Sequence, residues 1–259
     1  MRATILLLLF ALAGCRAEPP RELRTADATH VTASAAPAGD GCRQTSGQRP
    51  DTSIRLLDTV AVDSWRRAFG RGGVEYTCEI HPTLALRFVP VVDPAGPSVD
   101  SVVVHATGES ARALQVLSRQ PGEAESPMPY YTDILRAIDL DADGWRDLLV
   151  GKFWGATGNR GYDVWRYAPS AHRFVADTML SQLCNPDPIP GRACIASHAN
   201  SSARDDGTAV YCLHAGRWRL DSAVTNHWNR DSSTVTRTTA ARRGDSLVLL
   251  RRETRPDSI

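Results

Sequence analysis

The sequence predicts an all-β, antiparallel domain, and three observations support this. Short runs rich in Val, Leu, Thr, Trp and Tyr recur along the chain, at 98–106, 113–119, 146–154, 163–168, 209–215, 217–224, 233–241 and 246–253. Gly, Pro, Asp and Ser separate these runs at intervals typical of antiparallel strands. Segments with helical periodicity are scarce. Gly207, Gly216 and Gly244 lie where tight turns between the last strands would need them.

The first residues predict an export signal. Its apolar run, residues 3–13, is too short to span a bilayer as a helix and has the length of a secretory hydrophobic region. The run ends in LAGC, which resembles a bacterial lipoprotein signal in which residues 1–14 are removed and Cys15 receives the lipid. Arg16 follows where an aspartate would signal inner-membrane retention, which favours the periplasmic face of the outer membrane. An ordinary signal peptide with a chance cysteine is the alternative.

A flexible tether is expected after the anchor. Residues 15–50 contain hardly any large apolar side chains, so they cannot bury enough surface to offset the entropy of ordering them. Residues 51–259 remain as a β-rich globular domain with a sizeable core. With 30 basic and 29 acidic residues, the chain is nearly neutral, which argues against nucleic acid or an anionic membrane surface as its main partner.

One acidic segment, DLDADGWRDLLV at 139–150, predicts a calcium site. Its carboxylates alternate around a glycine, and they belong to Asp139, Asp141, Asp143 and Asp147. Calcium binds six to eight oxygen ligands, and the carbonyl of Trp145 can supply one of them. Because only oxygen ligands are offered, a hard cation is favoured over zinc or copper. Val150 stands where an EF-hand would carry glutamate, so Asp147 has to complete the shell. A solvated acidic turn is the alternative.

The cysteines indicate disulfides, as expected for an exported chain. Apart from Cys15 there are five, at 42, 78, 184, 194 and 212. We predict a Cys184–Cys194 bond, because the intervening loop has three prolines and a glycine, and a Cys42–Cys78 bond. Cys212 is left over and could replace either partner in the first pair. No CxxC motif occurs, which disfavours a cysteine metal site.

The acidic segment also resembles a known motif. DLDADGWRDLLV is similar to the DxDxDGxxDL calcium loop of FG-GAP and integrin-type propeller repeats. The following GATGNRGYDVWRYAPSAHRFV and MLSQLCNP resemble a family of calcium-loop periplasmic lipoproteins, which includes immunity proteins against peptidoglycan-cleaving glycoside hydrolases delivered by type IV secretion systems. The signature occurs once instead of once per blade, which favours a compact propeller-like or sandwich-like domain over a full propeller.

The resemblance implies a non-enzymatic role as an inhibitor of a peptidoglycan hydrolase. Such enzymes cut with two carboxyl groups in a cleft, which a rigid loop can block. Asn159, Arg160 and Tyr162 lie in the glycine-rich segment after the calcium loop and are the expected contacts. An ordinary core position is the alternative for Tyr162. HExxH, GxSxG and P-loop patterns are absent from the sequence. An FG-GAP-like saccharide-binding or adhesion module is the alternative function.

Overall fold

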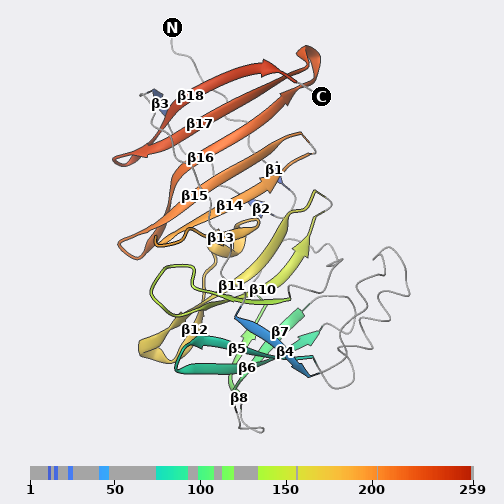
Figure 1. The fold of residues 1–259 in the computed structure, drawn as a ribbon, viewed down its shortest axis with the longest axis vertical. Helices are drawn as coiled ribbons and strands as arrows, with labels where there is room; N and C mark the ends of the chain where they lie inside the picture. The colour runs from blue at the N-terminus through green and yellow to red at the C-terminus, as the bar shows by residue number, and fades with distance from the viewer. Residues whose placement is uncertain are drawn as a thin grey trace, which may run out of the picture.

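The structure, a computed structural model, describes residues 11–12, 15–16, 23–25, 41–46, 74–92, 99–107, 113–119, 134–155, 157–202 and 204–257. Within these residues the chain forms β-strands and short 3-10 helices but no α-helix, which confirms the all-β prediction. Three large sheets follow one another along the molecule (Figure 1). We call them the lower, middle and upper sheets. In the described part, no helix has the length and apolarity to cross a membrane.

The lower sheet has the strand order β4-β5-β6-β7-β8. Its strands are β4 (Cys42–Ser46), β5 (Glu75–His81), β6 (Leu84–Val92), β7 (Val99–Ala106) and β8 (Ala113–Ser118). Along β5, Tyr76, Cys78 and Ile80 are buried while their neighbours are more exposed, the alternation of a strand with one face on the core. Since β4 belongs to this sheet, the ordered domain begins before the predicted boundary at residue 51.

The middle sheet has the order β12-β11-β10-β9 and carries the candidate site. Its strands are β9 (Leu135–Ile138), β10 (Asp147–Trp154), β11 (Arg160–Ala168) and β12 (Arg173–Ala176). Leu148 packs in a core shared with the lower sheet, whereas its neighbour Leu149 packs in a second core shared with the upper sheet. A strand covered on both faces explains why this segment reads as a continuous apolar run.

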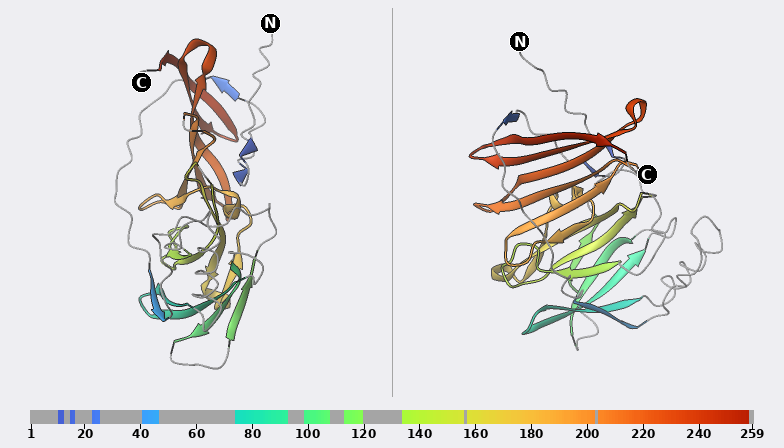
Figure 2. Two further views of the ribbon diagram at one scale, coloured as in Figure 1. Left: turned by 90° about the vertical axis from the view of Figure 1, so that its right-hand side faces the viewer. Right: turned by 45° about the horizontal axis from the view of Figure 1, so that its top comes forward.

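The upper sheet has the order β13-β14-β15-β16-β17-β18-β3. Its strands are β13 (Pro186–Pro188), β14 (Cys194–Asn200), β15 (Asp206–His214), β16 (Arg217–Asn229), β17 (Thr234–Arg243), β18 (Ser246–Pro256) and β3 (Leu23–Thr25). All neighbours are antiparallel except β3, which pairs in parallel with β18 and lies within the predicted tether. In Figure 2 the upper sheet, coloured orange to red, forms one end of the molecule.

The turn predictions are confirmed in part. Gly216 and Gly244 have φ angles of 75° and 61° and close the hairpins β15–β16 and β17–β18. Gly207 instead lies inside β15, opposite Ala199 and Thr225. The chain turns before it, where the amides of residues 201 and 202 donate to the carbonyl of Asp205.

The disulfides confirm one prediction and correct another. Cys42 and Cys78 are bonded, as expected, and face each other across β4 and β5. The predicted Cys184–Cys194 bond is wrong, because Cys194 is bonded to Cys212, its direct partner across β14 and β15. The register of β13 against β14 carries Cys184 toward Ala199, at the other end of β14. None of the cysteines in the described part is a free thiol.

The lipid-anchor prediction falls largely outside the described residues. β1 (Ala11–Leu12) and β2 (Cys15–Arg16) form a small antiparallel pair, but the side chain of Cys15 is not among those described. Removal of residues 1–14 and lipidation of Cys15 therefore stay predictions.

Candidate metal centre

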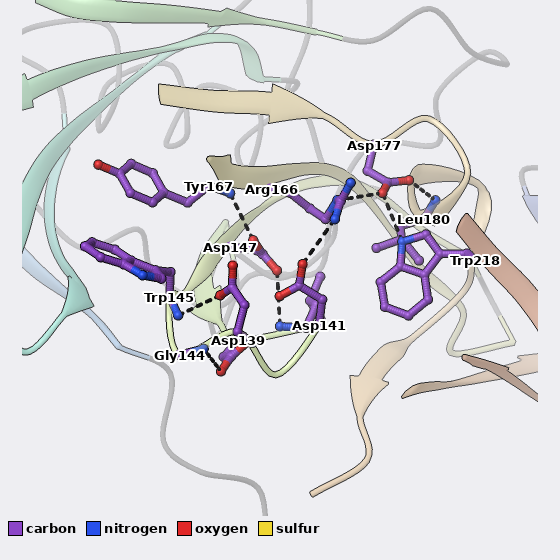
Figure 3. A network of polar contacts seen from close by, with 12 residues as sticks. Asp139, Asp141, Gly144, Trp145, Asp147, Arg166, Tyr167, Asp177, Leu180 and Trp218 are labelled. Atoms are coloured by element: carbon purple, nitrogen blue, oxygen red, sulfur yellow. Dashed lines mark hydrogen bonds and ion pairs between the residues drawn. The ribbon is translucent and has the colours of Figure 1, made fainter. Parts of the chain in front are cut away.

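The acidic segment forms the loop between β9 and β10, and its own backbone orients the carboxylates (Figure 3). Asp139 Oδ1 and Oδ2 accept hydrogen bonds from the amides of Asp143, at 3.2 Å, and Gly144, at 3.0 Å. Asp143 Oδ1 accepts from the amide of Trp145 at 2.8 Å. Gly144 has a φ of 88°, which glycine adopts at little cost and which closes the loop.

Three carboxylates converge at the centre of this loop. Asp139, Asp141 and Asp143 each offer an oxygen, and these oxygens lie within 4.8 Å of one another. The side chain of Asp141 is only 10% exposed, and its Oδ1 has no hydrogen-bond partner among the described residues. A buried carboxylate oxygen without a donor is costly, and a bound cation removes that cost.

Asp147 lies beside this group and connects the loop to the sheet. It is 1% exposed, and its Oδ2 and Oδ1 accept the backbone amides of Leu140 at 3.1 Å and Tyr167 at 3.0 Å. Burial raises the pKa of Asp147 well above its usual range, and the charge of Asp141 raises it further. Burial, together with the charges of Asp141 and Asp139, also raises the pKa of Asp143. The site therefore concentrates negative charge that favours either protons or a cation.

Trp145 fixes the loop against two sheets. Its ring stacks on His81 of β5, with centroids 4.2 Å apart, and on Tyr167 of β11, at 5.2 Å. The amide of Arg146 donates to the carbonyl of Ile80 at 2.7 Å. The predicted ligand at Trp145 is its backbone carbonyl, and these contacts hold that backbone in place.

Sequence reasoning missed Arg166, which links the loop to the upper sheet. Its guanidinium donates to Asp141 Oδ2 at 3.1 Å and lies 3.0 Å from Asp177 Oδ2. Asp177 in turn accepts the indole N–H of Trp218 at 3.0 Å and the amide of Leu180 at 3.0 Å. No local spacing pattern could have indicated this network, because its contacts join residues that lie far apart in the chain.

The three residues predicted to contact a partner are buried or half-buried. Tyr162 is 2% exposed and packs with Val164 in the core toward the upper sheet, which corresponds to the alternative of an ordinary core position. Asn159 is 5% exposed; its Nδ2 donates to the carbonyl of Asn200, and its Oδ1 accepts the amide of Asn200, both at 2.8 Å. Arg160 is half-buried.

The exposed part of this segment is the turn before Asn159. Thr157 and Gly158 are exposed, and the amide of Gly158 donates to the carbonyl of Gly155 at 3.0 Å. Thr157 is fixed from two sides by Asn200: its hydroxyl donates to the carbonyl of Asn200 at 3.0 Å, and Nδ2 of Asn200 donates to the carbonyl of Thr157 at 3.0 Å. The turn is thus attached firmly to the end of β14.

Comparison with known proteins gives a similarity to a solved structure. No family model and no curated protein matches the sequence. A solved structure of a Xanthomonas type IV secretion system related protein aligns with a TM-score of 0.46 and 15% sequence identity, over 70% of this chain and 95% of that one. A similarity of this size carries no conclusion about function.

Proposed function

We propose that this chain is a calcium-binding protein of the cell envelope, with one ion in the loop between β9 and β10. The observation that supports this most strongly is the buried, unpartnered Oδ1 of Asp141 beside the carboxylates of Asp139 and Asp143. Carboxylate and carbonyl oxygens suit calcium, and the carbonyl of Trp145 and the side chain of Asp147 would complete its shell. The ion supplies the positive charge that this acidic group needs.

An envelope location is proposed on two grounds. The described part contains two disulfides, which form and persist in oxidising compartments. The N-terminal segment has the pattern of an export signal that ends at Cys15. Anchored there by lipid, the domain would face the periplasm.

Calorimetric titration with calcium tests the site. Asp141→Asn removes the charge of the ligand with the unpartnered oxygen, so we expect it to abolish or strongly weaken binding. Asp245→Asn is the matched control, because the side chain of Asp245 is 97% exposed and lies in the β17–β18 turn. Equal calcium affinity in both variants would contradict the proposal.

As the role of this calcium-binding domain we propose inhibition of a peptidoglycan-cleaving glycoside hydrolase. The resemblance of residues 130–220 to the calcium-loop lipoproteins suggests it, and the rigid turn at Thr157 and Gly158 supports it. A short turn held by Asn159 and Asn200 loses little entropy on entering a cleft. With Tyr162 in the core, the contact moves to the turn itself and to Arg160.

Inhibition is measured by the turnover of peptidoglycan by a panel of such hydrolases with and without the protein. Thr157→Arg places a bulky side chain on the turn and should weaken inhibition at least about tenfold, a loss of ~1.4 kcal/mol. Ser170→Arg is the control, since Ser170 is exposed at the opposite end of β11. Binding of peptidoglycan without inhibition of any enzyme would favour the saccharide-binding or adhesion alternative.

A further inference from the structure

A continuous polar chain leads from the metal loop to the upper sheet (Figure 3). Arg166 Nη1 lies 3.1 Å from Asp141 Oδ2, and Nε of the same guanidinium lies 3.0 Å from Asp177 Oδ2. That second oxygen also accepts the indole N–H of Trp218 at 3.0 Å. Arg166 belongs to β11 and Trp218 to β16, so four side chains connect the loop to the neighbouring sheet.

Along this series of polar contacts there are two carboxylates but one guanidinium. The side chains of Asp141 and Asp177 are each 10% exposed, and the side chain of Arg166 is 33% exposed. One positive group therefore serves two buried carboxylates and offsets only one of their negative charges. A cation in the loop would compete with Arg166 for Asp141, and Asp177 would remain as the guanidinium's carboxylate partner. Because Nη1 contacts Asp141 and Nε contacts Asp177, the guanidinium can lose the first carboxylate and keep the second.

On the basis of the calcium site proposed above, we propose that Arg166 communicates occupancy of the loop to the upper sheet. Calcium displaces the guanidinium from Asp141, and the guanidinium shifts fully onto Asp177. Trp218 donates to the same Asp177 oxygen that Arg166 Nε contacts, so its hydrogen bond weakens. Because coupling between two sites is reciprocal, changes that shift Arg166 toward either carboxylate also change calcium affinity.

Three indole N–H signals in the NMR spectrum of the full chain test this proposal. Trp145 lies in the loop and reports occupancy. Trp218 reports the far end of the polar chain. Trp228, also on β16 but covered by Arg204 at 4.4 Å, is the internal control. Each signal is assigned with a Trp→Phe variant. We expect calcium to move the signals of Trp145 and Trp218 and to leave that of Trp228 in place.

Two variants test whether Arg166 competes with calcium for Asp141 or instead supports the loop. Arg166→Met removes the competing guanidinium, so calcium should bind about threefold more tightly, as loss of a partly exposed ion pair allows. Calcium should then still move the Trp145 signal but no longer that of Trp218. Asp177→Asn takes away the alternative carboxylate and keeps Arg166 on Asp141, so calcium should bind more weakly. Arg219→Met, at an exposed arginine paired with Asp245, should change neither property.

The outcomes distinguish this coupling from the calcium site itself. A calorimetric signal and a moving Trp145 resonance with a static Trp218 resonance in the unmodified chain would overturn the coupling and leave the site standing. Weaker binding in both Arg166→Met and Asp177→Asn would show that Arg166 supports the loop instead of competing. Absence of both the calorimetric signal and the Trp145 shift would overturn the proposed site.

Discussion

Asp141 takes part in both the candidate metal site and the ion pair with Arg166. One of its oxygens is held by Arg166, and the other is buried without a partner in the described part of the chain. Its charge also raises the pKa values of Asp143 and Asp147. The same residue thus joins a candidate ligand set to an ion pair, and its electrostatic effect extends to both neighbours.

Calcium binding should weaken as the pH falls, and from a higher pH than for ordinary aspartates. Burial raises the pKa values of Asp143 and Asp147, so protons compete with the ion above the usual aspartate range. The calcium-free fold gains stability as pH falls through these raised pKa values, because protonation removes the buried charge. In the calcium-bound fold these carboxylates stay ionised, as they are in the unfolded chain, so its stability changes little over the same range and the difference between the two forms shrinks.

Thermal melts in metal-free and calcium-containing buffer, at neutral and mildly acidic pH, measure this effect. We expect the calcium-induced rise in melting temperature to shrink on acidification. Asp141→Asn, which lacks a ligand charge, should show almost no calcium-induced rise at either pH. A rise that grows on acidification would contradict the proposed ligand set.

Gly161 is required by close packing. A Cβ at this position would lie 2.1 Å from Cε1 of the buried Phe153 ring, so Gly161→Ala should destabilise the fold by about 1–3 kcal/mol. Gly207→Ala is the matched control, because its Cβ would meet Thr225 at an ordinary 3.5 Å. Urea unfolding compares the two variants. A smaller loss for Gly161→Ala than for Gly207→Ala would refute this account of the packing.

At the scale of elements, the strands with strong apolar patterns were predictable and those defined by pairing were not. β10 and β11 follow from their own side chains, since "RDLLVGKFW" and "DVWRYA" are rich in strand-forming residues. β14, with the sequence CIASHAN, is short of large apolar residues and is a strand because β13 and β15 flank it. Its prediction required the tertiary pairing.

The same limit explains why the sequence left two positions open for Tyr162, a partner contact or the core. The sequence places it correctly at the start of a strand, but which face it occupies depends on the register of β11 against β10, where Gly151 opposes it beside a bulge. A shift of one residue would turn it to the other face. By contrast, the loop carboxylates were predictable because their spacing is local and the backbone of the same segment orients them.

The cross-strand disulfides make a direct prediction. Proteolysis of the oxidised protein, followed by mass spectrometry, should yield a peptide pair joined through Cys194 and Cys212 and another joined through Cys42 and Cys78. Replacement of the first pair by alanine should cost about 3 kcal/mol, as expected for a closed loop of this size. Recovery of a fragment with Cys184 linked to Cys194 would instead restore the pairing that the sequence suggested.

For the whole molecule, the loop matters because it contacts all three sheets. It joins β9 to β10, stacks Trp145 on His81 of the lower sheet, and connects to Trp218 of the upper sheet through Arg166. An ion in the loop should therefore stabilise the domain as a unit. At a hundredfold excess over its dissociation constant, calcium should add about 2.7 kcal/mol to the free energy of unfolding.

Urea unfolding measured once with calcium and once with a chelator checks this gain in the free energy of unfolding. The slope of the free energy against urea should be unchanged, because the same surface is exposed on unfolding in both cases. Asp245→Asn should retain the full effect, and Asp141→Asn should lose it. A calcium-independent midpoint for the unmodified chain would contradict a role for the loop in global stability.

The order of the sheets along the chain has a consequence for how the molecule is assembled. Apart from β3, each large sheet is made of strands that follow one another in sequence, first the lower, then the middle, then the upper. A polypeptide that emerges amino end first can therefore complete each layer before the next has appeared. The parallel pairing of β3 with β18 is different, because it joins a strand near the amino end to the last strand of the chain and must wait for the carboxyl end.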